Sequence, residues 1–397
     1  MELYLHIPFC VQKCSYCDFL SWSVDEPTKD RYLRALLNEI SFYGNLKYDE
    51  SGQTTAWHLD GIETVYFGGG TPSVLGADRL LLLLDAIFAH FRVKNGCEIT
   101  VEINPATITD VSLEKLQKKG VNRLSIGLQS TNNTQLVTLG RVHTYEDFLE
   151  IYGQARAVGF KNLNIDLISS IPGQSVKSYQ ETLEEVIRLK PEHISAYSLI
   201  LEEGTPFYDK YADHPELLPG EEEDREMYHL TKSMLQEAGY MRYEISNYAT
   251  PGFKSKHNIG YWERIPYLGL GLGASSFYFS KRKKNFTNLA EYLQVWENME
   301  KTCRDTNFRN FSPFEEIIDL TKKDEMSEYL FLGLRMTKGV SISGFEARFG
   351  QKMMDVYGRE IEKLQKEGLL VVEKRKDRIF LTDFGMDVSN YVFEKFI

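Results

Sequence analysis

Long hydrophobic runs are missing from this sequence. The longest lies around residues 80–84, far short of the roughly 20 apolar residues that a membrane-spanning helix needs. The N-terminus also lacks the basic region, apolar core and small-residue cleavage site of a secretory signal. We therefore expect a protein without a transmembrane segment that works in the cytoplasm.

An excess of basic residues is absent too. Lys and Arg total 46 against 57 Asp and Glu, which gives a formal net charge of -11 at pH 7. Proteins that bind nucleic acid broadly do so by neutralising phosphates with basic side chains. The acidic balance argues against that class, and we expect no nucleic-acid partner. The basic run at 281–284 is predicted to be a solvated loop.

Cysteine is scarce, with five in 397 residues, yet three of the five are crowded into one stretch. Cys10, Cys14 and Cys17 lie close together, while Cys97 and Cys303 stand alone. Disulfides are uncommon in a chain of this size without a secretory signal. Three clustered thiolates instead favour a metal centre, either a zinc ion with an open position or an iron–sulfur cluster with one open iron.

Short β-rich runs alternate with helical patterns over the first two thirds of the chain. This order is typical of βα units around a parallel sheet. The runs that we predict to be strands are 3–7, 64–67, 98–103, 123–128, 163–168 and 194–199, with a seventh near 240–245. The pattern predicts an α/β fold, a partial (β/α)6 barrel open at one side. Chemistry in such barrels gathers where the strands end, which is where the cysteine cluster follows the first strand.

Two further parts follow the barrel. The segment 247–313 is less periodic and rich in aromatic residues and glycine, and we expect it to bridge back onto the barrel. Helical patterns near 325–336, 343–349 and 353–366 then precede a predicted β-hairpin at 369–372 and 379–381. That order resembles a winged helix. The predicted domains are a barrel (1–246), a bridging segment (247–313) and a small C-terminal α+β winged-helix-like domain (314–397).

Several polar residues stand on the predicted strands or just past their ends. The run Gly68-Gly69-Gly70-Thr71-Pro72 lets backbone amides approach a ligand, although an ordinary βα turn has the same composition. Glu102 lies in an apolar strand and needs a buried partner, either a cationic ligand or a structural arginine. The planar fork of Arg141 can bind a carboxylate bidentately, and the carboxylate of Asp166 accepts hydrogen bonds. For these two and for Gln129, a solvated or locally paired polar residue is the alternative.

The cysteine spacing, with Tyr16 before the last cysteine and the leader Tyr4-Leu5-His6-Ile7-Pro8-Phe9, resembles the cluster motif of the radical S-adenosylmethionine enzymes. The resemblance implies a 4Fe-4S cluster held by Cys10, Cys14 and Cys17, with an electron donor to reduce it. It also implies that S-adenosylmethionine binds the open iron. The residues that match the family's cofactor contacts are Tyr4, Tyr16, Gly69, Gly70, Thr71, Glu102, Gln129, Arg141 and Asp166.

The leader narrows the resemblance to the branch that contains oxygen-independent coproporphyrinogen III oxidase and the HemW-type haem chaperones. The oxidase carries a further cysteine, needed for activity, two residues after the third cluster cysteine, where this chain has Phe19. The oxidase also has an N-terminal extension ahead of the leader tyrosine, whereas this chain starts three residues before Tyr4. Both differences remove parts of the decarboxylation machinery, so they argue against oxidase activity.

A second motif favours the chaperones. His257-Asn258-Ile259-Gly260-Tyr261-Trp262 matches their His-Asn-x-x-Tyr-Trp pattern. Imidazole is a common axial ligand of haem iron, and aromatic rings can pack on a porphyrin. The resemblance therefore predicts that His257, Asn258, Tyr261 and Trp262 bind haem, the alternative being a structural histidine. Relatives often have histidine where this chain has Ser275, so no second ligand is assigned.

Together these features predict a haem chaperone that binds haem, a 4Fe-4S cluster and S-adenosylmethionine and delivers haem to an acceptor haemoprotein. One alternative is the oxidative decarboxylation of coproporphyrinogen III to protoporphyrinogen IX. Another is a radical enzyme that acts on an unrelated substrate. The family resemblance also suggests a homodimer.

Overall fold

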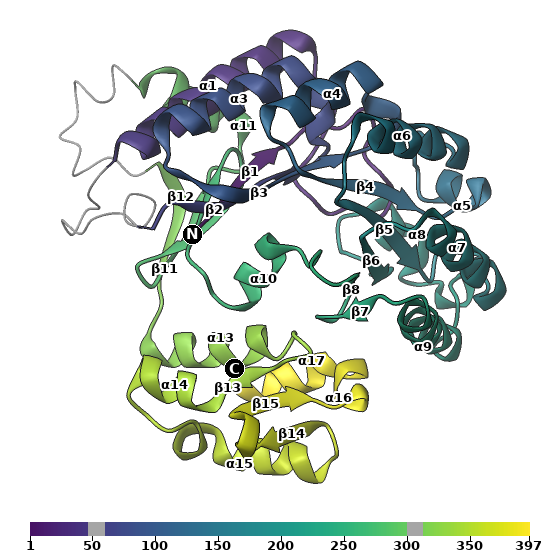
Figure 1. Cartoon of the computed structure of the whole chain (residues 1–397), viewed down its shortest axis with the longest axis vertical. Coiled ribbons are helices and arrows are strands. Elements are labelled where there is room, and N and C mark those ends of the chain that lie inside the picture. Colours follow the sequence, from purple (N-terminus) through teal and green to yellow (C-terminus); the bar gives the residue numbers. More distant parts are fainter. Residues whose placement is uncertain (47–59, 300–312) are drawn as a thin grey trace.

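A row of parallel strands forms the centre of the molecule (Figure 1). The computed structural model describes residues 1–46, 60–299 and 313–397, and Cys303 lies outside them. The parallel strands are β1 (Glu2–Ile7), β2 (Ile62–Gly69), β3 (Val93–Ile103), β4 (Arg123–Gln129), β5 (Leu163–Ser169) and β6 (His193–Ser198). Each pairs in parallel with the next in chain order. The predicted α/β fold with a partial (β/α)6 barrel is confirmed.

Helices cover the outer face of these strands (Figure 1). They are α1 (Glu26–Asn45), α3 (Ala77–His90), α4 (Asp110–Lys119), α6 (Tyr145–Val158) and α7 (Val176–Leu189), and α9 (Glu221–Glu237) packs beside α7. Gly120 and Gly159 follow α4 and α6 with φ of 109° and 108°. This left-handed conformation suits glycine and turns the chain directly into the next strand. Within the described ranges, no helix has both the length and the apolar character needed to cross a bilayer.

Side chains of the barrel strands alternate between two environments, because successive residues of a strand point to opposite faces. In β3, Ile99 and Val101 belong to the main hydrophobic core, which also contains residues of the covering helices. Glu98, Thr100 and Glu102 therefore point to the other face, into the barrel. The interior of the barrel is lined by polar side chains that the helices do not cover.

Among the described residues, further strands extend the sheet on both sides to twelve. Next to β1 come β9 (Tyr267–Leu270), β10 (Ser275–Tyr278), β11 (Lys281–Asn285) and β12 (Phe314–Asp319), and next to β6 come β8 (Asn247–Ala249) and β7 (Met241–Arg242). The predicted seventh strand at 240–245 is thus observed only as the short β7, which is antiparallel to β8 at the edge. The helix α11 (Leu289–Glu297) packs against α1.

The prediction that the basic run 281–284 is a solvated loop is wrong. The run forms β11, which pairs with β10 and β12. Lys283 is 8% exposed, and its ammonium lies 4.6 Å from the ring centroid of Tyr278 and 4.8 Å from that of Phe314. A buried ammonium is stabilised over aromatic faces. Charge patterning along the run gave no sign of these aromatic partners.

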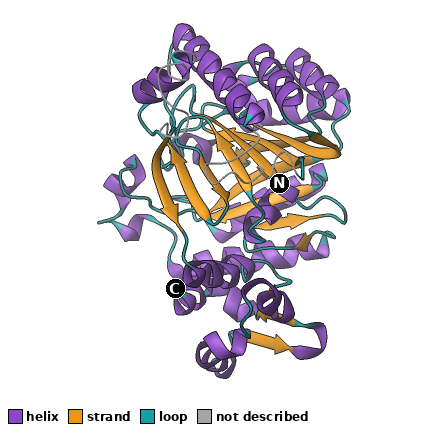
Figure 2. Ribbon diagram, turned by 90° about the vertical axis from the view of Figure 1, so that its left-hand side faces the viewer, coloured by secondary structure: helices purple, strands orange, loops and turns teal. Residues whose placement is uncertain are grey.

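The C-terminal residues form a small unit with a hydrophobic core of its own (Figure 2). Its helices are α13 (Lys322–Gly333), α14 (Ile342–Phe349), α15 (Met353–Lys366), α16 (Asp383–Asp387) and α17 (Ser389–Phe393). Its three-stranded sheet has the order β13 (Val340–Ser341), β15 (Arg378–Leu381), β14 (Leu370–Glu373). The predicted helices and the predicted hairpin are present, which confirms the small C-terminal α+β domain.

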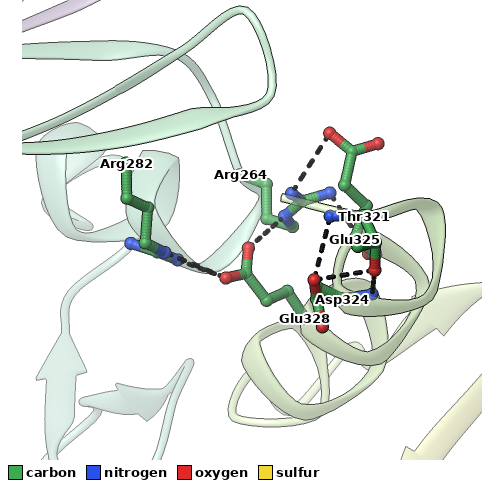
Figure 3. Close-up of polar contacts among 6 residues, drawn as sticks. All are labelled: Arg264, Arg282, Thr321, Asp324, Glu325 and Glu328. Carbon is green, nitrogen blue, oxygen red and sulfur yellow. Dashed lines mark hydrogen bonds and ion pairs between the residues drawn. The ribbon is translucent and has the colours of Figure 1, made fainter. Parts of the chain in front are cut away.

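The short helix α10 (Lys256–Trp262) lies between the barrel and the C-terminal unit (Figure 1). Directly after it, Arg264 donates from Nε to Glu328 of α13 at 3.0 Å (Figure 3). Arg282 of β11 donates to the other oxygen of the same carboxylate at 2.9 and 2.8 Å. The guanidinium of Arg335 also lies 4.3 Å from the ring centroid of Trp262. Ionic and aromatic contacts therefore hold the C-terminal unit against α10.

Candidate functional site

A cavity of about 430 Å³ opens where the parallel strands end. Cys10, Cys14 and Cys17, from the loop after β1, line it together with residues of β2 to β6, and it continues into the barrel interior as far as Arg123 and Asn164. In βα barrels this end of the strands is where chemistry gathers. The cavity thus lies where the strand pattern and the cysteine cluster predicted a site.

Backbone hydrogen bonds fix the cysteine loop to the barrel. Cys10 N donates to Trp22 O at 3.1 Å, and Trp22 N donates to Pro8 O at 3.1 Å, so the two ends of the loop are held together. In the middle of the loop, Ser15 N donates to Leu139 O at 3.0 Å. The three cysteines of the loop are free and half-buried. Their sulfur atoms are therefore held in place and accessible from the cavity.

This donor set fits an iron–sulfur cluster. Thr71 Oγ1 lies 3.5 Å from Cys10 Sγ, and Arg141 Nη1 donates to Cys14 Sγ at 3.6 Å. Hydrogen bonds of this kind to sulfur are among the features that tune such clusters. Among the residues placed by the structure, no three His, Cys, Asp or Glu side chains converge closely enough to hold one metal ion. The thiolates of a cluster each bind a different iron, so they need not converge in that way.

The glycine turn after β2 packs directly against the cysteine loop. Gly70 N donates to Ile7 O at 2.9 Å, and Thr71 N donates to Phe9 O at 2.8 Å. Gly69 has φ of 114°, and a Cβ on Gly70 would lie 2.7 Å from Phe9 O. Backbone conformation thus requires glycine at position 69, and close approach requires it at position 70. Both glycines and Thr71 line the cavity, as predicted.

Two half-buried carboxylates, Glu102 on β3 and Asp166 on β5, also line the cavity. Burial raises the pKa of Glu102 to about 7 and raises the pKa of Asp166 above its ordinary value. Tyr66 Oη donates to Glu102 Oε1 at 2.7 Å. A permanently cationic ligand such as a sulfonium would be favourable here, because it would offset the cost of burying the carboxylate charges.

Arg123 is a site residue that sequence reasoning missed. It is 1% exposed and lines the same cavity, and its charge favours the ionised forms of Glu102 and Asp166. Its Nε and Nη1 atoms have no hydrogen-bond partner. Arg123 is therefore a buried positive charge in the interior that acts on both carboxylates, and the strongest charge acting on Arg123 itself is that of Glu98. The available signal was the alternation of Arg123 and Ser125 with apolar residues along the strand.

A third group of predicted residues lies beside the cysteine loop. Gln129 ends β4 with φ of 73°, which is unusual for a residue with a Cβ. Arg141 donates from Nη2 to Gly127 O at 2.7 Å, while its Nε has no hydrogen-bond partner. Tyr16 is half-buried, and the desolvation of its hydroxyl raises its pKa. Tyr16, Gln129 and Arg141 all line the cavity, and the guanidinium is placed to bind an anionic group.

Tyr4 is not among the residues that line the cavity. Its hydroxyl is hydrogen-bonded to His6 Nδ1 at 3.1 Å. Its ring stacks with those of Tyr66 and His257, at centroid distances of 6.3 and 6.4 Å. Tyr4 is therefore placed to support Tyr66, which does line the cavity.

The predicted haem motif occupies α10, near the start of strands β2 and β3. The carboxylate of Glu98 accepts from Lys256 N at 3.0 Å and from His257 N at 3.3 Å. His257 is 1% exposed, and its Nδ1 and Nε2 are hydrogen-bonded to Thr64 Oγ1 at 2.7 Å and to Tyr261 Oη at 2.9 Å. Burial, with the positive charge of a nearby arginine, lowers the pKa of His257 to about 3. The imidazole is neutral, and both of its nitrogens are engaged.

The four motif residues are therefore divided between two places. Asn258 lines the cavity. His257 and Tyr261 are bonded to each other, and Trp262 lies under Arg335 at the junction with the C-terminal unit. The structure does not bring these three residues to the cavity wall.

Comparison with known proteins agrees with this architecture. Residues 4–186 match the Radical SAM superfamily, and residues 320–388 match the HemN C-terminal domain. The heme chaperone HemW of Lactococcus lactis subsp. lactis is 36% identical over 397 residues, which covers 99% of this chain and 96% of that protein. The heme chaperone HemW of Bacillus subtilis is 33% identical over 395 residues, which covers 99% of this chain and 98% of that protein.

Among solved structures, the coproporphyrinogen III oxidase HemN of Escherichia coli superposes with a TM-score of 0.81 at 23% identity. The match covers 100% of this chain and 89% of that chain, and at this identity it shows the fold alone. The full-length similarity to the HemW proteins is closer and shows the family. The chain belongs to the HemW family of radical S-adenosylmethionine proteins.

Proposed function

We propose that this protein is a haem chaperone, which binds haem and passes it to an acceptor haemoprotein. The observation that carries the proposal is that three free thiols line the cavity while Phe19 stands where the oxidase has its further cysteine. The printed names of the full-length relatives support the same function. We place the protein in the cytoplasm, because free thiols and an iron–sulfur cluster persist in a reducing compartment. A homodimer and an electron donor for the cluster are part of the proposal on family grounds.

Cys10, Cys14 and Cys17 would hold a 4Fe-4S cluster, and the cavity beside them would hold S-adenosylmethionine. When bound and reduced, the cluster supplies one electron to the sulfonium compound. Arg141 would bind a carboxylate of this ligand through its fork of donors. Glu102 would stabilise positive charge on the ligand because both are shielded from water.

For haem, the mouth of the cavity provides an apolar surface. Phe19 is 61% exposed, Tyr197 42% and Ile200 67%, and all three line the cavity. Phe19 follows β1 and the other two belong to the end of β6 or follow it, so they come from the first and last parallel strands. Exposed apolar side chains gathered at a cavity are typical of ligand sites. We propose that one porphyrin face packs on these side chains.

Axial ligation of haem iron by His257 is a second proposal, and it would require the imidazole to leave its present hydrogen-bond partners. The imidazole would have to leave Thr64 and Tyr261, to which it is hydrogen-bonded. Each hydrogen bond of a buried group contributes about 1 kcal/mol. Haem would therefore have to displace part of α10, whereas the mouth of the cavity requires no such movement.

A haem titration of the anaerobically reconstituted protein tests the function and separates the two haem sites. Wild type should bind haem stoichiometrically, as measured by the haem absorption band. Loss of binding in Phe19→Ser with retention in His257→Ala would place haem at the mouth, and the reverse result would place it at α10. Absence of haem binding by the wild type would contradict the proposed function. The iron content of each variant serves as the control for an intact cluster.

A further inference from the structure

A chain of hydrogen bonds in the barrel interior connects Asp166 to Tyr243. Asn164, two residues earlier on β5, donates from Nδ2 to Asp166 Oδ1 at 2.8 Å and to Ser125 Oγ at 2.7 Å. Ser125 Oγ in turn donates to Asp166 Oδ2 at 3.0 Å. Both oxygens of the carboxylate thus accept hydrogen bonds from side chains that are 1% and 3% exposed. These contacts orient the carboxylate, provided that the amide of Asn164 keeps its NH2 group toward Asp166.

His193 fixes the amide of Asn164. Its Nδ1 is hydrogen-bonded to Asn164 Oδ1 at 2.6 Å, and Ser195 Oγ donates to the same oxygen at 3.1 Å. Since an amide oxygen only accepts, Nδ1 must carry the proton. Burial and the charge of Arg123 hold the pKa of His193 well below its ordinary value, so the ring is neutral and Nε2 is an acceptor. A proton on Nδ1 of His193 and the hydroxyl of Ser195 therefore both favour the orientation in which the amide oxygen faces them and the NH2 group faces Asp166.

Tyr243 stabilises this tautomer. Its hydroxyl lies 2.8 Å from His193 Nε2, and its oxygen accepts from Ser255 N at 3.3 Å. Because Nε2 of the neutral ring is an acceptor, the hydroxyl of Tyr243 donates to it. The backbone carbonyl of Tyr243 accepts from Thr337 N at 3.0 Å, which ties the far end of this chain of hydrogen bonds to the turn after α13. The direction of every donor from Tyr243 to Asp166 is thereby determined.

We propose that Tyr243 and His193 are positioning residues for Asp166, which they hold in the orientation that accepts a hydrogen bond from a ligand in the cavity. They act through Asn164 and touch no ligand themselves. The inference rests on the proposed function, in which the cavity holds S-adenosylmethionine, and on the prediction from the family resemblance that Asp166 contacts it. It goes beyond that role because it assigns control of the carboxylate to residues outside the cavity wall.

The substitution Tyr243→Phe removes one hydroxyl and little volume. It leaves His193 Nε2 without its donor, so the imidazole keeps only one of the two hydrogen bonds that hold its ring in place. A ring that is held by one bond fixes Asn164 Oδ1 less firmly, and the amide of Asn164 then orients the carboxylate of Asp166 less well. Loss of one such hydrogen bond predicts a rise of about three- to tenfold in the dissociation constant of S-adenosylmethionine.

The test is equilibrium binding of S-adenosylmethionine to the full chain after anaerobic cluster reconstitution. Tyr240→Phe is the matched control, because Tyr240 is 4% exposed and donates to Pro191 O at 2.8 Å, away from this chain of hydrogen bonds. We expect Tyr243→Phe to weaken binding with unchanged iron content and Tyr240→Phe to leave it within about twofold. His193→Gln, which retains a donor and an acceptor, should bind better than His193→Leu.

A double-substitution cycle shows whether the effect passes through Asp166. We expect Asp166→Asn alone to weaken binding more than Tyr243→Phe, and the double variant to bind like Asp166→Asn. Additive effects, or equal behaviour of Tyr243→Phe and Tyr240→Phe, would overturn the positioning role while leaving the cofactor site intact. Wild-type affinity in Asp166→Asn would instead overturn the cofactor role of Asp166, and the positioning role with it.

Discussion

Glu328 is the central acceptor of the contacts that join the C-terminal unit to the rest of the chain (Figure 3). The side chains of Glu328 and Arg264 are 10% and 1% exposed, whereas that of Arg282 is 36% exposed. In Glu328→Ala, Arg282 can turn to solvent, but Arg264 stays buried. Its remaining ionic partner is Glu325, at 3.8 Å. Breaking one side of a buried ion pair costs about 3 kcal/mol or more, so we expect a loss of about 3 kcal/mol at this junction.

Amide hydrogen exchange along α13 measures this loss as a decrease in the free energy of local opening. The control is Glu114→Ala, which removes the partner of Lys118 from a pair with side chains 54% and 70% exposed. An exposed pair of this kind contributes about 0.5 kcal/mol or less. Replacing both Arg264 and Glu328 by Met should recover most of the stability, because no charge is then left buried. A loss in Glu328→Ala that is no larger than in the control would refute this reasoning.

Three further predictions concern the cavity. Cys14→Ser should abolish the broad visible absorption of the reconstituted cluster, and an unchanged spectrum would refute its assignment as a ligand. Gly70→Ala should destabilise the protein by about 1–3 kcal/mol in thermal unfolding, because its Cβ would meet a carbonyl oxygen at 2.7 Å. Gly153→Ala, where the Cβ meets nothing within 4 Å, should instead be neutral or stabilising. Since the pKa of Glu102 is about 7, it is charged above pH 7 and protonated below. Affinity for the sulfonium ligand should therefore fall about tenfold per pH unit below 7 in wild type, and a Glu102→Gln variant with the same slope would contradict the assignment.

Much of the barrel and of its cavity could be predicted because the signals are local. Apolar runs of strand length, separated by helical periodicity, predicted the six parallel strands. The cysteine spacing placed three thiols directly after β1, and strand ends predicted that the glycine turn, Glu102 and Asp166 would meet. Parallel strands in chain order bring these segments to one edge without further information.

The predictions from sequence were wrong or incomplete for residues whose environment depends on parts of the chain that are distant in sequence. The basic run 281–284 forms β11, where the ammonium of Lys283 lies over the rings of Tyr278 and Phe314. Arg282 of the same strand pairs with Glu328. The composition of the run did not reveal these partners, because they come from other parts of the chain. The environment of His257 depends on Thr64, 193 positions away. Sequence pattern gave the histidine motif but not its burial, since that depends on how α10 packs into the barrel.

The polar interior of the barrel was missed for another reason. Arg123, Asn164 and His193 alternate with apolar residues, as strand residues on a solvated face also do. Only closure of the sheet around them turns that face inward. Their hydrogen bonds to one another therefore became visible only in the folded chain.

We propose that this family member carries haem and does not oxidise coproporphyrinogen III. The most direct measurement exposes one reconstituted sample, with its reductant and S-adenosylmethionine, to haem and to coproporphyrinogen III in parallel. We expect stoichiometric haem binding and no protoporphyrinogen IX. Robust formation of protoporphyrinogen IX by a chain with Phe19 at the position of the oxidase cysteine would contradict it.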